Sequence, residues 1–371
     1  MAWSPQQEQA IKAVTEWLRD KRGPKVFRLF GFAGTGKTTI AKEIAANVSG
    51  RAIFGAFTGK AALVLKSKGC DNASTIHSMI YKVEEGSTGQ PTFVLNRDSD
   101  VRGAKVVIID ECSMVDEALG KDLLSFGTRI LVLGDPAQLP PVKGQGFFTS
   151  DRPDVLLTEI HRQAADNPII RMSMDVREGR RLQVGSYGGS KVIRRADLKQ
   201  SDVLSADQVL VGMNRTRRSF NGRLRELNGF SGELPTEGDR IICLRNNKDK
   251  GLLNGSIWKA RDVKLVPVDE DLDVITATAA PADEYTAGSA DVFVTVPRQF
   301  FLGTEDTLDW RTRRDFDEFD FGYAITVHKS QGSQWDNVML FDESGSFRDN
   351  RMNWLYTGIT RAADRVTVVL P

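Results

Sequence analysis

Hydrophobic positions near the start of the chain follow a helical spacing. Between Pro5 and Arg19 the apolar residues recur three and four positions apart, and Ser4 with Pro5 stands where a helix would begin. The residues expected on the buried face are Ala10, Ile11, Val14, Trp17 and Leu18. The pattern therefore predicts an amphipathic helix over residues 5–19 with Ser4 as its N-cap.

Short apolar runs then alternate with further helical segments. The predicted strands are residues 25–31, 51–59, 104–111 and 129–135. The predicted helices between them are residues 38–48 and 61–69. Because these strands are almost continuously Val, Ile and Leu, we expect them to be buried on both faces, as in a parallel sheet covered by helices.

Two stretches have a different pattern. Alternating residues on both sides of 86–91 predict a β-hairpin that projects from the sheet. From residue 238 to 303, short alternating strands separated by Asn, Gly and Asp predict a small antiparallel barrel inserted into a larger domain. Helical and parallel-strand patterns return over residues 323–371, which predicts a second α/β core.

Composition excludes several classes of protein. The 371 residues, 40% hydrophobic and 27% charged, suffice for two or three domains with buried cores and exclude a disulfide-stapled miniprotein or a disordered tail. There is no run of about 20 apolar residues and no signal pattern in the first ten, so we expect a protein of the cytoplasm without a membrane segment. Cys70, Cys112 and Cys243 are widely spaced, which favours small core residues over a disulfide framework or a zinc site.

Overall charge gives no reason to expect a polyanionic partner, since 50 Lys and Arg balance 49 Asp and Glu. Contact with a polyanion would have to come from local clusters. The candidates are Arg177, Arg180, Arg181, Arg215, Arg217, Arg218, Arg311, Arg313 and Arg314. A solvated helix face is the more ordinary interpretation of any one cluster, so the clusters alone decide nothing.

The sequence GFAGTGKT, residues 31–38, matches the phosphate-binding pattern G-x-x-x-x-G-K-[ST] between a predicted strand and a predicted helix. Glycines let backbone N–H groups wrap a polyphosphate, Lys37 would reach the β and γ phosphates, and the Thr38 hydroxyl would bind Mg²⁺. ATP and Mg²⁺ are the expected cofactors. The expected phosphate contacts are Gly34, Thr35, Gly36, Lys37, Thr38 and Thr39.

Two further strand ends carry candidate catalytic groups. Asp110 and Glu111 end the predicted strand VVIIDE, where Asp110 would hold Mg²⁺ and Glu111 would orient and deprotonate an attacking water. A strand-terminal acidic pair is weak evidence by itself, but after a phosphate-binding loop it favours hydrolysis over passive binding. Gln138, in LGDPAQLPPV, has a neutral amide able to touch a γ-phosphate; the alternative is an ordinary proline-rich turn.

Eight short motifs occur in one order along the chain: GFAGTGKT, AFTGKAA, TIHS, IIDECSM, LGDPAQLPPV, LTEIHRQ, ITVHKSQG and YTGITRA. This series resembles that of superfamily 1 DNA helicases, most closely the RecD and Dda type, and it extends from Gln7 to Ala362. The length of the chain is more similar to that of compact, phage-type Dda enzymes than to a subunit of a larger nuclease complex.

The resemblance implies an α/β fold with two RecA-like lobes. The expected N-terminal lobe comprises residues 1–80 and 104–160, and the expected C-terminal lobe comprises residues 161–237 and 304–371. The hairpin, residues 81–103, would be the strand-separating insertion of the first lobe, and the barrel, residues 238–303, would be the insertion of the second.

Nucleotide contacts beyond the phosphate-binding loop are also implied by the resemblance. Gln7 lies at the position of the family's adenine-reading glutamine, although Gln6 and Gln9 are close by. Arg162 and Arg361 match the two arginines that approach the γ-phosphate, where a guanidinium fork stabilises developing charge. Gln334 stands where the family often has a ribose-binding Glu, so ribose selectivity is in doubt.

Contacts to single-stranded DNA are implied for Thr58, Lys60, His77, Thr326, His328 and Lys329. The alternative for the two histidines is an ordinary residue at the end of a helix or strand. In the hairpin, Phe93 would stack on a base at the junction with duplex DNA.

The implied activity is ATP-driven translocation on single-stranded DNA, 5′ to 3′, with unwinding of the duplex ahead. The expected partners are single-stranded DNA and its junctions with duplex, bound by a monomer. An ATPase that remodels nucleoprotein complexes, or acts on RNA, with little processive unwinding is the alternative. A metabolic P-loop kinase is a poorer interpretation, because it would not need the C-terminal motifs.

Overall fold

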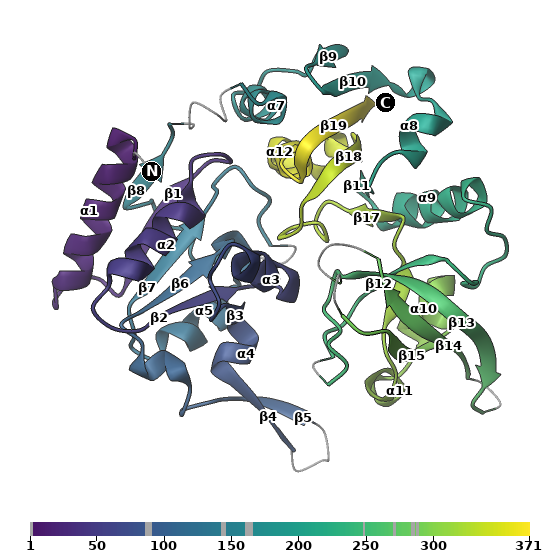
Figure 1. The fold of residues 1–371 in the computed structure, drawn as a ribbon, viewed down its shortest axis with the longest axis horizontal. Coiled ribbons are helices and arrows are strands. Elements are labelled where there is room, and N and C mark those ends of the chain that lie inside the picture. Colours follow the sequence, from purple (N-terminus) through teal and green to yellow (C-terminus); the bar gives the residue numbers. More distant parts are fainter. Residues whose placement is uncertain are drawn as a thin grey trace. The chain divides into compact units, whose positions relative to one another are not determined.

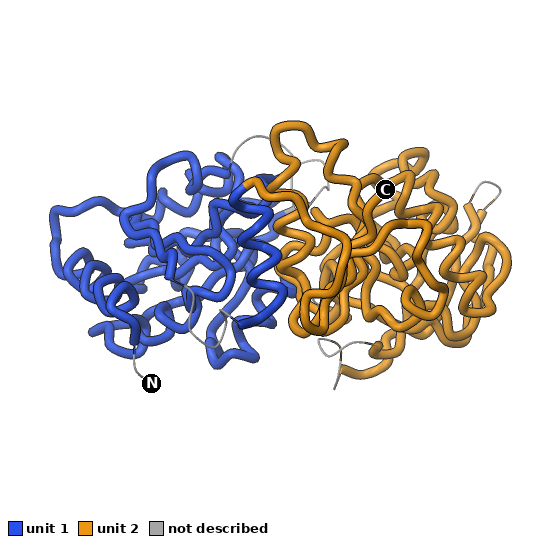
Figure 2. Tube along the Cα trace, turned by 90° about the horizontal axis from the view of Figure 1, so that it is seen from above, with its two compact units in different colours: residues 1–178 blue, residues 179–371 orange. Residues whose placement is uncertain are grey.

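The computed structural model describes residues 3–85, 91–141, 146–159, 166–247, 249–269, 272–282, 286 and 289–371. The chain divides into two compact units, Met1–Glu178 and Gly179–Pro371 (Figure 2). The sequence predicts the boundary between the two lobes at residue 160. Helix α7 (Pro168–Arg177) instead falls within unit 1, where the guanidinium of Arg177 lies over the ring of Phe32, 3.7 Å from its centroid.

Unit 1 contains a six-stranded sheet whose neighbours in the order β3-β2-β6-β7-β1-β8 all pair in parallel (Figure 1). Its strands are β1 (Val26–Gly31), β2 (Ala52–Ala56), β3 (Ser74–Thr75), β6 (Val106–Asp110), β7 (Ile130–Gly134) and β8 (Val155–Leu157). Its other helices are α1 (Pro5–Arg19), α2 (Lys37–Asn47), α3 (Gly59–Ser67), α4 (Ile76–Ile80) and α5 (Glu117–Leu124).

Alternate residues of the central strand β6 enter two different hydrophobic cores. Val106 and Ile108 pack with residues of α1, α2 and α3, whereas Val107 and Ile109 pack with residues of α4 and α5. Because side chains of a strand alternate between faces, helices must cover both sides of the sheet. The predicted parallel sheet with two buried faces is confirmed.

Helix α1 has the predicted bounds and the predicted N-cap. The Ser4 side chain accepts a hydrogen bond from the Gln7 N–H at 3.3 Å, and the Gln7 side chain accepts one from the Ser4 N–H at 3.1 Å. This reciprocal capping box satisfies two N–H groups that a helix start otherwise leaves without partners. The residues of this cap lie within four positions of one another, so the sequence alone could predict Ser4 as the N-cap.

The predicted hairpin is formed by β4 (Tyr81–Glu85) and β5 (Pro91–Leu95), which pair antiparallel (Figure 1). Residues 86–90, between the strands, lie outside the described part of the chain. Val83 and Phe93 stand opposite each other in the ladder, and both side chains are exposed, Phe93 to 68%. The hairpin is anchored at its base, where the Tyr81 hydroxyl donates to the carboxylate of Asp122 in α5.

Unit 2 contains a second six-stranded sheet, in the order β17-β11-β18-β19-β10-β9, in which only the edge pair β10–β9 is antiparallel. Its strands are β9 (Gly185–Tyr187), β10 (Ser190–Arg194), β11 (Gln208–Val211), β17 (Ala324–Thr326), β18 (Trp335–Phe341) and β19 (Ala362–Leu370). Its helices are α8 (Gln200–Leu204), α9 (Asn214–Leu227), α10 (Gln299–Leu302), α11 (Trp310–Asp315) and α12 (Arg351–Ile359).

The inserted antiparallel sheet has the order β15-β14-β13-β12-β16. Its strands are β12 (Arg240–Cys243), β13 (Ile257–Pro267), β14 (Asp273–Pro281), β15 (Val292–Pro297) and β16 (Phe319–Phe321). Inward residues of all five strands share one hydrophobic core. The backbone N–H of Asp317 donates to the Thr295 carbonyl at 2.8 Å, which joins the segment before β16 to β15 and brings the two edges together.

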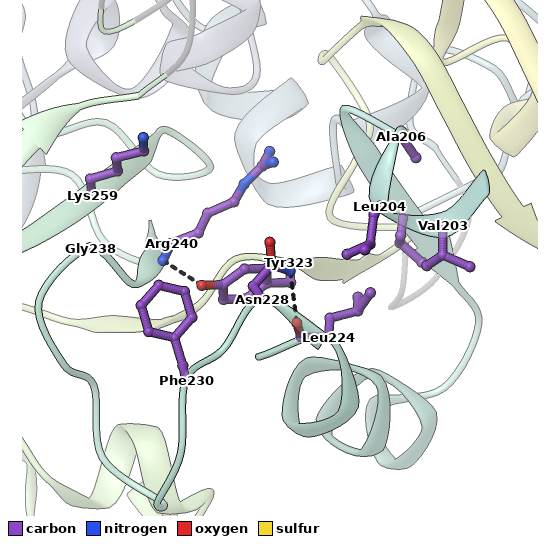
Figure 3. Close-up of a pocket in the computed structure, with 11 residues that line it drawn as sticks. Val203, Leu204, Ala206, Leu224, Asn228, Phe230, Gly238, Arg240, Lys259 and Tyr323 are labelled. Atoms are coloured by element: carbon purple, nitrogen blue, oxygen red, sulfur yellow. Dashed lines mark hydrogen bonds between the residues drawn. The ribbon is translucent and has the colours of Figure 1, made fainter. Parts of the chain in front are cut away.

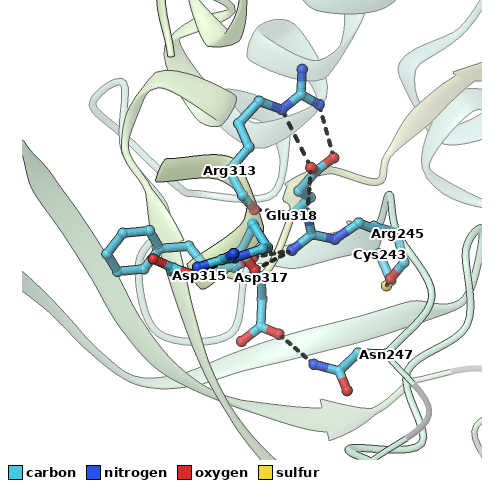
Figure 4. Close-up of polar contacts among 9 residues, drawn as sticks. Cys243, Arg245, Asn247, Arg313, Asp315, Asp317 and Glu318 are labelled. Carbon is cyan, nitrogen blue, oxygen red and sulfur yellow. Dashed lines mark hydrogen bonds and ion pairs between the residues drawn. The ribbon is translucent and has the colours of Figure 1, made fainter. Parts of the chain in front are cut away.

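This sheet reaches beyond the predicted insert of residues 238–303, because β16 pairs with β12. A three-residue strand has too short a pattern to be recognised in the sequence. Around it, the guanidinium of Arg313 donates to both oxygens of Glu318, and the Asp317 carboxylate accepts from Asn247 (Figure 4). These contacts hold the end of α11 and the approach to β16 against the loop after β12.

Helix α9 carries a polar stripe that is buried against the insert. Arg217, Asn221 and Arg225 are four residues apart and therefore lie on one face of the helix. Arg217 pairs with Asp320, Asn221 exchanges hydrogen bonds with Ala324, and Arg225 pairs with Asp239 at 2.8 Å. Burial raises the pKa of the Asp320 carboxyl, and the Arg217 guanidinium opposes that rise.

The Arg225–Asp239 pair is the most enclosed of these contacts, with side chains 4% and 0% exposed. Arg225 also donates to the carbonyls of Gly232 and Leu234, and Asp239 accepts from the Tyr323 hydroxyl at 3.0 Å. Every strong polar group of the pair therefore has a partner, as a buried charge requires.

The three cysteines lie in three different hydrophobic cores, as the sequence predicted for small core residues. Cys70 and Cys112 belong to the two cores of unit 1, and Cys243 belongs to the core of the insert. Among the residues that the structure describes, no helix is both long and apolar enough to cross a membrane.

Replacing Asp239 by Asn should destabilise unit 2 by about 3 to 5 kcal/mol, because it leaves the buried Arg225 charge uncompensated. Urea denaturation followed by circular dichroism measures the loss. Arg223→Met on the same helix is the matched control, since Arg223 pairs with Glu226 on the surface and should contribute less than about 1 kcal/mol. Equal losses in the two variants would show that the buried pair does not anchor the insert.

Candidate functional site

The phosphate-binding loop lies between β1 and α2, as predicted. Gly34 and Gly36 have φ values of +80° and +83°, a backbone conformation that favours glycine. A Cβ on Gly36 would lie 2.7 Å from the side-chain nitrogen of Gln7, so this position is also sterically restricted. The loop leads directly into the N-terminus of α2, where N–H groups lacking helical partners favour an anion.

A cavity of about 470 Å³ opens beside this loop. Its lining residues are Phe32, Gly34, Gly36, Lys37, Thr38, Thr39, Lys42 and Lys68. The Lys37 ammonium donates to the carbonyls of Gly31 and Phe32, at 2.6 and 3.0 Å, and Lys42 donates to the Lys68 carbonyl. Three ammonium groups and a helix N-terminus make the cavity suited to a polyphosphate.

Arg177 lies next to this cavity, although the sequence analysis placed it only in a basic cluster. Arg177, at the end of α7, stacks on Phe32, which lines the cavity. The contact is a cation–π interaction between residues far apart in the sequence. No local sequence pattern predicts such a contact, because the contact depends on how α7 packs against the phosphate-binding loop.

Gln7 is buried beneath the loop. Its side-chain amide donates to the Thr35 carbonyl at 3.0 Å, and its side-chain oxygen takes part in the capping box of α1. Gln7 therefore connects the start of α1 to the phosphate-binding loop. Neighbouring Gln6 contacts β8 and the residues after it: its amide donates to Leu156, and its side-chain oxygen accepts from the Thr158 N–H at 2.8 Å.

The acidic pair lies at the end of β6, close to the loop. The Thr38 hydroxyl donates to the Asp110 carboxylate at 3.1 Å, which brings together the two predicted metal ligands. Burial raises the pKa of Asp110, and the Glu111 carboxylate raises it further, while the Lys37 ammonium opposes both. A carboxylate whose charge is costly in this way gains from a cation beside it.

Glu111 has a left-handed backbone, with φ of +52° and ψ of +45°. A non-glycine residue in this conformation costs free energy and occurs often at functional sites. The Asp110 side chain accepts a hydrogen bond from the Glu111 N–H at 2.9 Å, which supports the turn. The turn carries the chain out of β6 into a short 3-10 segment, Cys112–Met114, with Glu111 at the junction.

Gln138 lies in the turn after β7, where its N–H donates to the Asp135 carbonyl at 3.1 Å. Its side chain is buried. The Asp135 carboxylate accepts from the Ala137 N–H and so fixes the same turn. Arg162 falls on residues 160–165, outside the described part of the chain.

The predicted groups of unit 1 gather because each follows a strand of one parallel sheet. The phosphate-binding loop follows β1, Thr58 follows β2, His77 follows β3, Asp110 ends β6 and Gln138 follows β7. In a parallel sheet the carboxyl ends of all strands meet at one edge, which is where ligands bind in open α/β folds.

Of the predicted DNA contacts in AFTGKAA, Thr58 and Lys60 differ in exposure. Thr58 is half-buried and caps α3 by accepting from the Ala61 N–H at 3.1 Å. The Lys60 side chain is only 2% exposed. A contact between Lys60 and a DNA phosphate would therefore require the ammonium to become exposed.

His77 belongs to a row of rings that leads from the sheet edge to the hairpin. Phe57 and His77 have ring centroids 5.8 Å apart, His77 and Tyr81 5.9 Å, and Tyr81 and Phe93 6.4 Å. Burial lowers the pKa of His77, and Asp116 opposes the decrease, so the imidazole is mainly neutral near pH 7. The sequence identified His77 and Phe93 but not Phe57 and Tyr81, which connect them.

In unit 2, the predicted DNA contacts of ITVHKSQG follow β17. The Thr326 hydroxyl accepts from the Lys329 N–H at 3.3 Å and so caps this turn. His328 is half-buried against Phe347, with ring centroids 5.6 Å apart, and burial lowers its pKa. Phe347 in turn stacks on the buried Trp354 of α12, 5.3 Å away, which supports the histidine from below.

Arg361 is held inside unit 2. Its guanidinium donates to the carbonyls of Thr357 and Ser333, at 3.1 and 3.3 Å, and its side chain is buried. Gln334 lies exposed in the turn before β18. The protein thus fixes the arginine within its own unit and presents the glutamine at the surface.

Arginines of the basic clusters form ion pairs within the fold. Arg217 is buried on α9 with Asp320, and Arg313 is held by Glu318. The sequence left a solvated helix face as the alternative; Arg217 is instead buried in its ion pair, and Arg313 is paired but partly exposed. The buried Arg217–Asp320 pair cannot contact a polyanion without breaking.

Comparison with known proteins identifies the family. A family model described as an AAA domain matches residues 2–198 of the 371, and a model described as a UvrD-like helicase C-terminal domain matches residues 321–369. The first match covers the phosphate-binding sheet of unit 1 and continues through β9 and β10 of unit 2, and the second covers β17–β19.

Two curated relatives are named as ATP-dependent DNA helicases. RecD2 of Deinococcus radiodurans is 29% identical over 377 residues, which cover 92% of this chain and 46% of RecD2. The dda helicase of Enterobacteria phage T4 is 33% identical over 189 residues, which cover 47% of this chain and 42% of dda. The chain thus spans less than half the length of these relatives.

Solved structures show the same fold. A Pif1 helicase from a study of unwinding at forked duplex DNA has a TM-score of 0.56 at 17% identity and covers 99% of this chain and 92% of its own. Pif1 helicase of Candida albicans has a TM-score of 0.54 at 19% identity, with 100% and 94% covered. The two units are RecA-like lobes, and the chain belongs to the superfamily 1 helicases of the RecD and Dda type.

Proposed function

We propose that this chain is an ATP-dependent DNA helicase that moves 5′ to 3′ along single-stranded DNA and unwinds the duplex ahead of it. The observation that carries the proposal is the convergence, at one edge of a parallel sheet, of the phosphate-binding loop, the Asp110–Glu111 pair and the loops of Thr58 and His77. ATP hydrolysis and contact with the DNA strand would then take place at the same edge of the sheet. A conformational change at the ATP site would be transmitted to the DNA contacts through neighbouring loops.

The relatives support the same activity. RecD2 and dda are named as ATP-dependent DNA helicases, and a structure of Pif1 from Bacteroides contains ADP-AlF3 and single-stranded DNA. The direction of movement rests on the family resemblance alone. We also propose that the hairpin acts as the strand-separating element of the first lobe and that the antiparallel insert is the inserted domain of the second lobe.

The residues present fit ATP and Mg²⁺. The left-handed backbone at Gly34 and Gly36, the N-terminus of α2 and the ammonium of Lys37 suit a triphosphate. The Thr38 hydroxyl and the Asp110 carboxylate are hard oxygen donors, which Mg²⁺ prefers. When bound, Mg²⁺ would neutralise phosphate charge and polarise the γ-phosphoryl group.

Each predicted catalytic group has a distinct task in the proposed reaction. The Glu111 carboxylate accepts a proton from the attacking water, and the Lys37 ammonium stabilises charge on the phosphate oxygens. Gln138 touches the γ-phosphate through its amide. Arg162 and Arg361 supply guanidinium groups to the developing charge.

Nucleoside recognition is proposed to depend on two glutamines. Gln7 is rigidly held by α1 and by the Thr35 carbonyl, so reading adenine would require it to exchange that carbonyl for the base. Gln334 is exposed and neutral, and would accept a ribose hydroxyl without adding charge. Selectivity for the sugar is therefore expected to be low.

The proposed DNA path of unit 1 follows the ring row Phe57, His77, Tyr81 and Phe93. A neutral imidazole and three aromatic rings favour stacking on bases over attraction to phosphate. Thr58 adds a hydroxyl at the start of the row. In unit 2 the proposed contacts are Thr326, His328 and Lys329. Lys60 is also proposed to contact a phosphate, which requires its buried ammonium to become exposed.

The direct test measures ATP hydrolysis with and without single-stranded DNA, and strand displacement on duplexes with a single 5′ or 3′ tail. We expect DNA to stimulate hydrolysis and only the 5′-tailed duplex to be unwound. Stimulated hydrolysis without displacement of either duplex would favour the remodelling alternative. Hydrolysis unaffected by DNA would contradict both.

Lys37→Ala and Glu111→Gln should both abolish turnover but differ in nucleotide affinity. Removing Lys37 deletes a charged phosphate contact worth about 1.5 to 3 kcal/mol, whereas Glu111→Gln removes only the proton acceptor. Equilibrium binding of a fluorescent ATP analogue distinguishes the two variants. Retained parental hydrolysis in Glu111→Gln would eliminate Glu111 as the base.

Phe93→Ala should leave DNA-stimulated hydrolysis unchanged and slow unwinding at least about fivefold, because base stacking on an aromatic ring contributes about 1 to 3 kcal/mol. The matched control is Phe293→Ala, which removes an exposed ring, 62% accessible, from strand β15 of the insert. Strand displacement at equal ATPase rate is the measurement. If Phe293→Ala is the slower variant, the insert and not the hairpin separates the strands.

A further inference from the structure

Unit 2 contains a cavity of about 320 Å³ where the insert meets the parallel sheet (Figure 3). Two hydrogen bonds drawn there are internal to the fold. The Arg240 N–H donates to the Tyr323 hydroxyl at 3.1 Å, and the Asn228 amide donates to the Leu224 carbonyl at 2.8 Å. The Arg240 guanidinium also donates to the side-chain oxygen of Gln208 in β11 at 2.9 Å. These contacts fasten the insert to the start of β11, so the cavity is part of the framework of unit 2.

Three loops meet at the carboxyl edge of the parallel strands of unit 2. Gly212 follows β11, His328 follows β17, and Phe347 lies in the 3-10 segment Ser344–Asn350 that follows β18. Strands β17, β11 and β18 are neighbours and pair in parallel, so the loops after them lie at one edge of the sheet. Phe347 connects the other two loops.

The ring of Phe347 is packed among three groups. Its centroid lies 5.6 Å from that of His328 and 5.3 Å from that of Trp354, with the Phe347 and Trp354 rings stacked at 15°. A Cβ on Gly212 would lie 2.8 Å from Cε2 of the Phe347 ring, so a larger residue at position 212 would displace the ring. The ring thus touches the proposed DNA contact of unit 2, the loop before α9, and α12.

The segment that carries Phe347 is held in place at a cost. The Glu343 carboxylate, just before the segment, accepts from the Gly212 N–H and the Thr216 hydroxyl, each at 2.6 Å. Arg348, directly after the ring, has φ of +43° and ψ of −113°, which is costly for a residue with a Cβ. Such strain persists only where surrounding contacts fix the chain. The position of Phe347 is therefore imposed by its contacts.

Trp354 leads from this ring toward Arg361. It is fully buried in α12, and its indole N–H has no hydrogen-bond partner within the described residues, so no hydrogen bond fixes the indole against Phe347. Thr357, about one turn further along α12, accepts a hydrogen bond from the Arg361 guanidinium at 3.1 Å. A displacement of Phe347 would thus reach the helix whose carbonyl holds Arg361.

We propose that Phe347 is a positioning residue that links the proposed DNA contact at His328 to α12 and Arg361, so that stimulation of hydrolysis by DNA depends on its ring. A strand that contacts His328 would press the imidazole against Phe347, and the stacked rings would pass the displacement to Trp354. Packed side chains transmit such shifts because they move between discrete arrangements. The inference rests on the proposed helicase function, and Phe347 lies outside the eight motifs from which that function was predicted.

The test measures ATP hydrolysis by the whole chain without DNA and with saturating single-stranded oligonucleotide, and compares the ratio of the two rates. Phe347→Leu should leave the rate without DNA close to that of the parent, because the Arg361 hydrogen bonds do not involve the ring. Its stimulation ratio should fall about fivefold or more, the scale of one lost ring contact. Saturating DNA separates this loss from a change in DNA affinity.

Phe220→Leu is the matched control, because Phe220 is also a half-buried ring of unit 2, packed on Phe341 with centroids 4.5 Å apart. It should keep the parental ratio, and thermal melting checks that both variants fold. Gly212→Ala keeps the Phe347 ring but displaces it, so it should lower the ratio as well. Combined with Phe347→Leu, which leaves room for the added methyl group, it should lose no more than Phe347→Leu alone.

The outcomes distinguish this inference from the helicase proposal. A parental ratio in Phe347→Leu, while DNA stimulates the parent, would overturn the link through Phe347 and leave the helicase proposal standing. An equal loss in Phe220→Leu would show a general effect of weakened packing in unit 2 and would also overturn the link. Hydrolysis by the parent that DNA leaves unchanged would contradict the helicase proposal, and the link with it.

Discussion

The function of unit 1 depends on one constraint, the parallel pairing of its six strands. Parallel strands end at the same edge, so loops separated by long stretches of chain are brought together without any direct pairing between them. The hydrogen bond from Thr38 to Asp110 is the evidence at atomic scale, since it joins residues 72 positions apart. Helices on both faces exclude water from the strands, so polar groups are exposed at the carboxyl edge of the sheet.

Unit 2 uses a different means to join its parts. Its antiparallel insert is fastened to α9 by the buried stripe of Arg217, Asn221 and Arg225. Buried ion pairs add little stability compared with apolar packing, because taking charges out of water is costly. The fork of Arg225 does, however, meet Asp239 in one geometry, whereas apolar side chains tolerate several.

Several groups proposed to bind nucleotide already have protein partners. Lys37 donates to two loop carbonyls, Gln7 to the Thr35 carbonyl and Arg361 to the carbonyls of Thr357 and Ser333. A ligand would therefore exchange one acceptor for another, so the net gain is smaller than the gross strength of a charged hydrogen bond. The same exchange would link nucleotide binding to movement of the loop backbone, because the released carbonyls would need other donors.

The sequence by itself determined those features whose cause lies within a few residues. Three such features are the N-cap of α1, the buried strand β6 and the glycines of the phosphate-binding loop, because periodicity, caps and backbone freedom act locally. The order of the motifs also identified the family. Tertiary structure alone decided that Lys60 is buried, that Phe32 and Arg177 stack, and that β16 completes the insert. Arg217 is the clearest case, because its partner Asp320 lies 103 positions away in the sequence. A local sequence pattern cannot predict this pairing, since only the folded chain brings the two residues together.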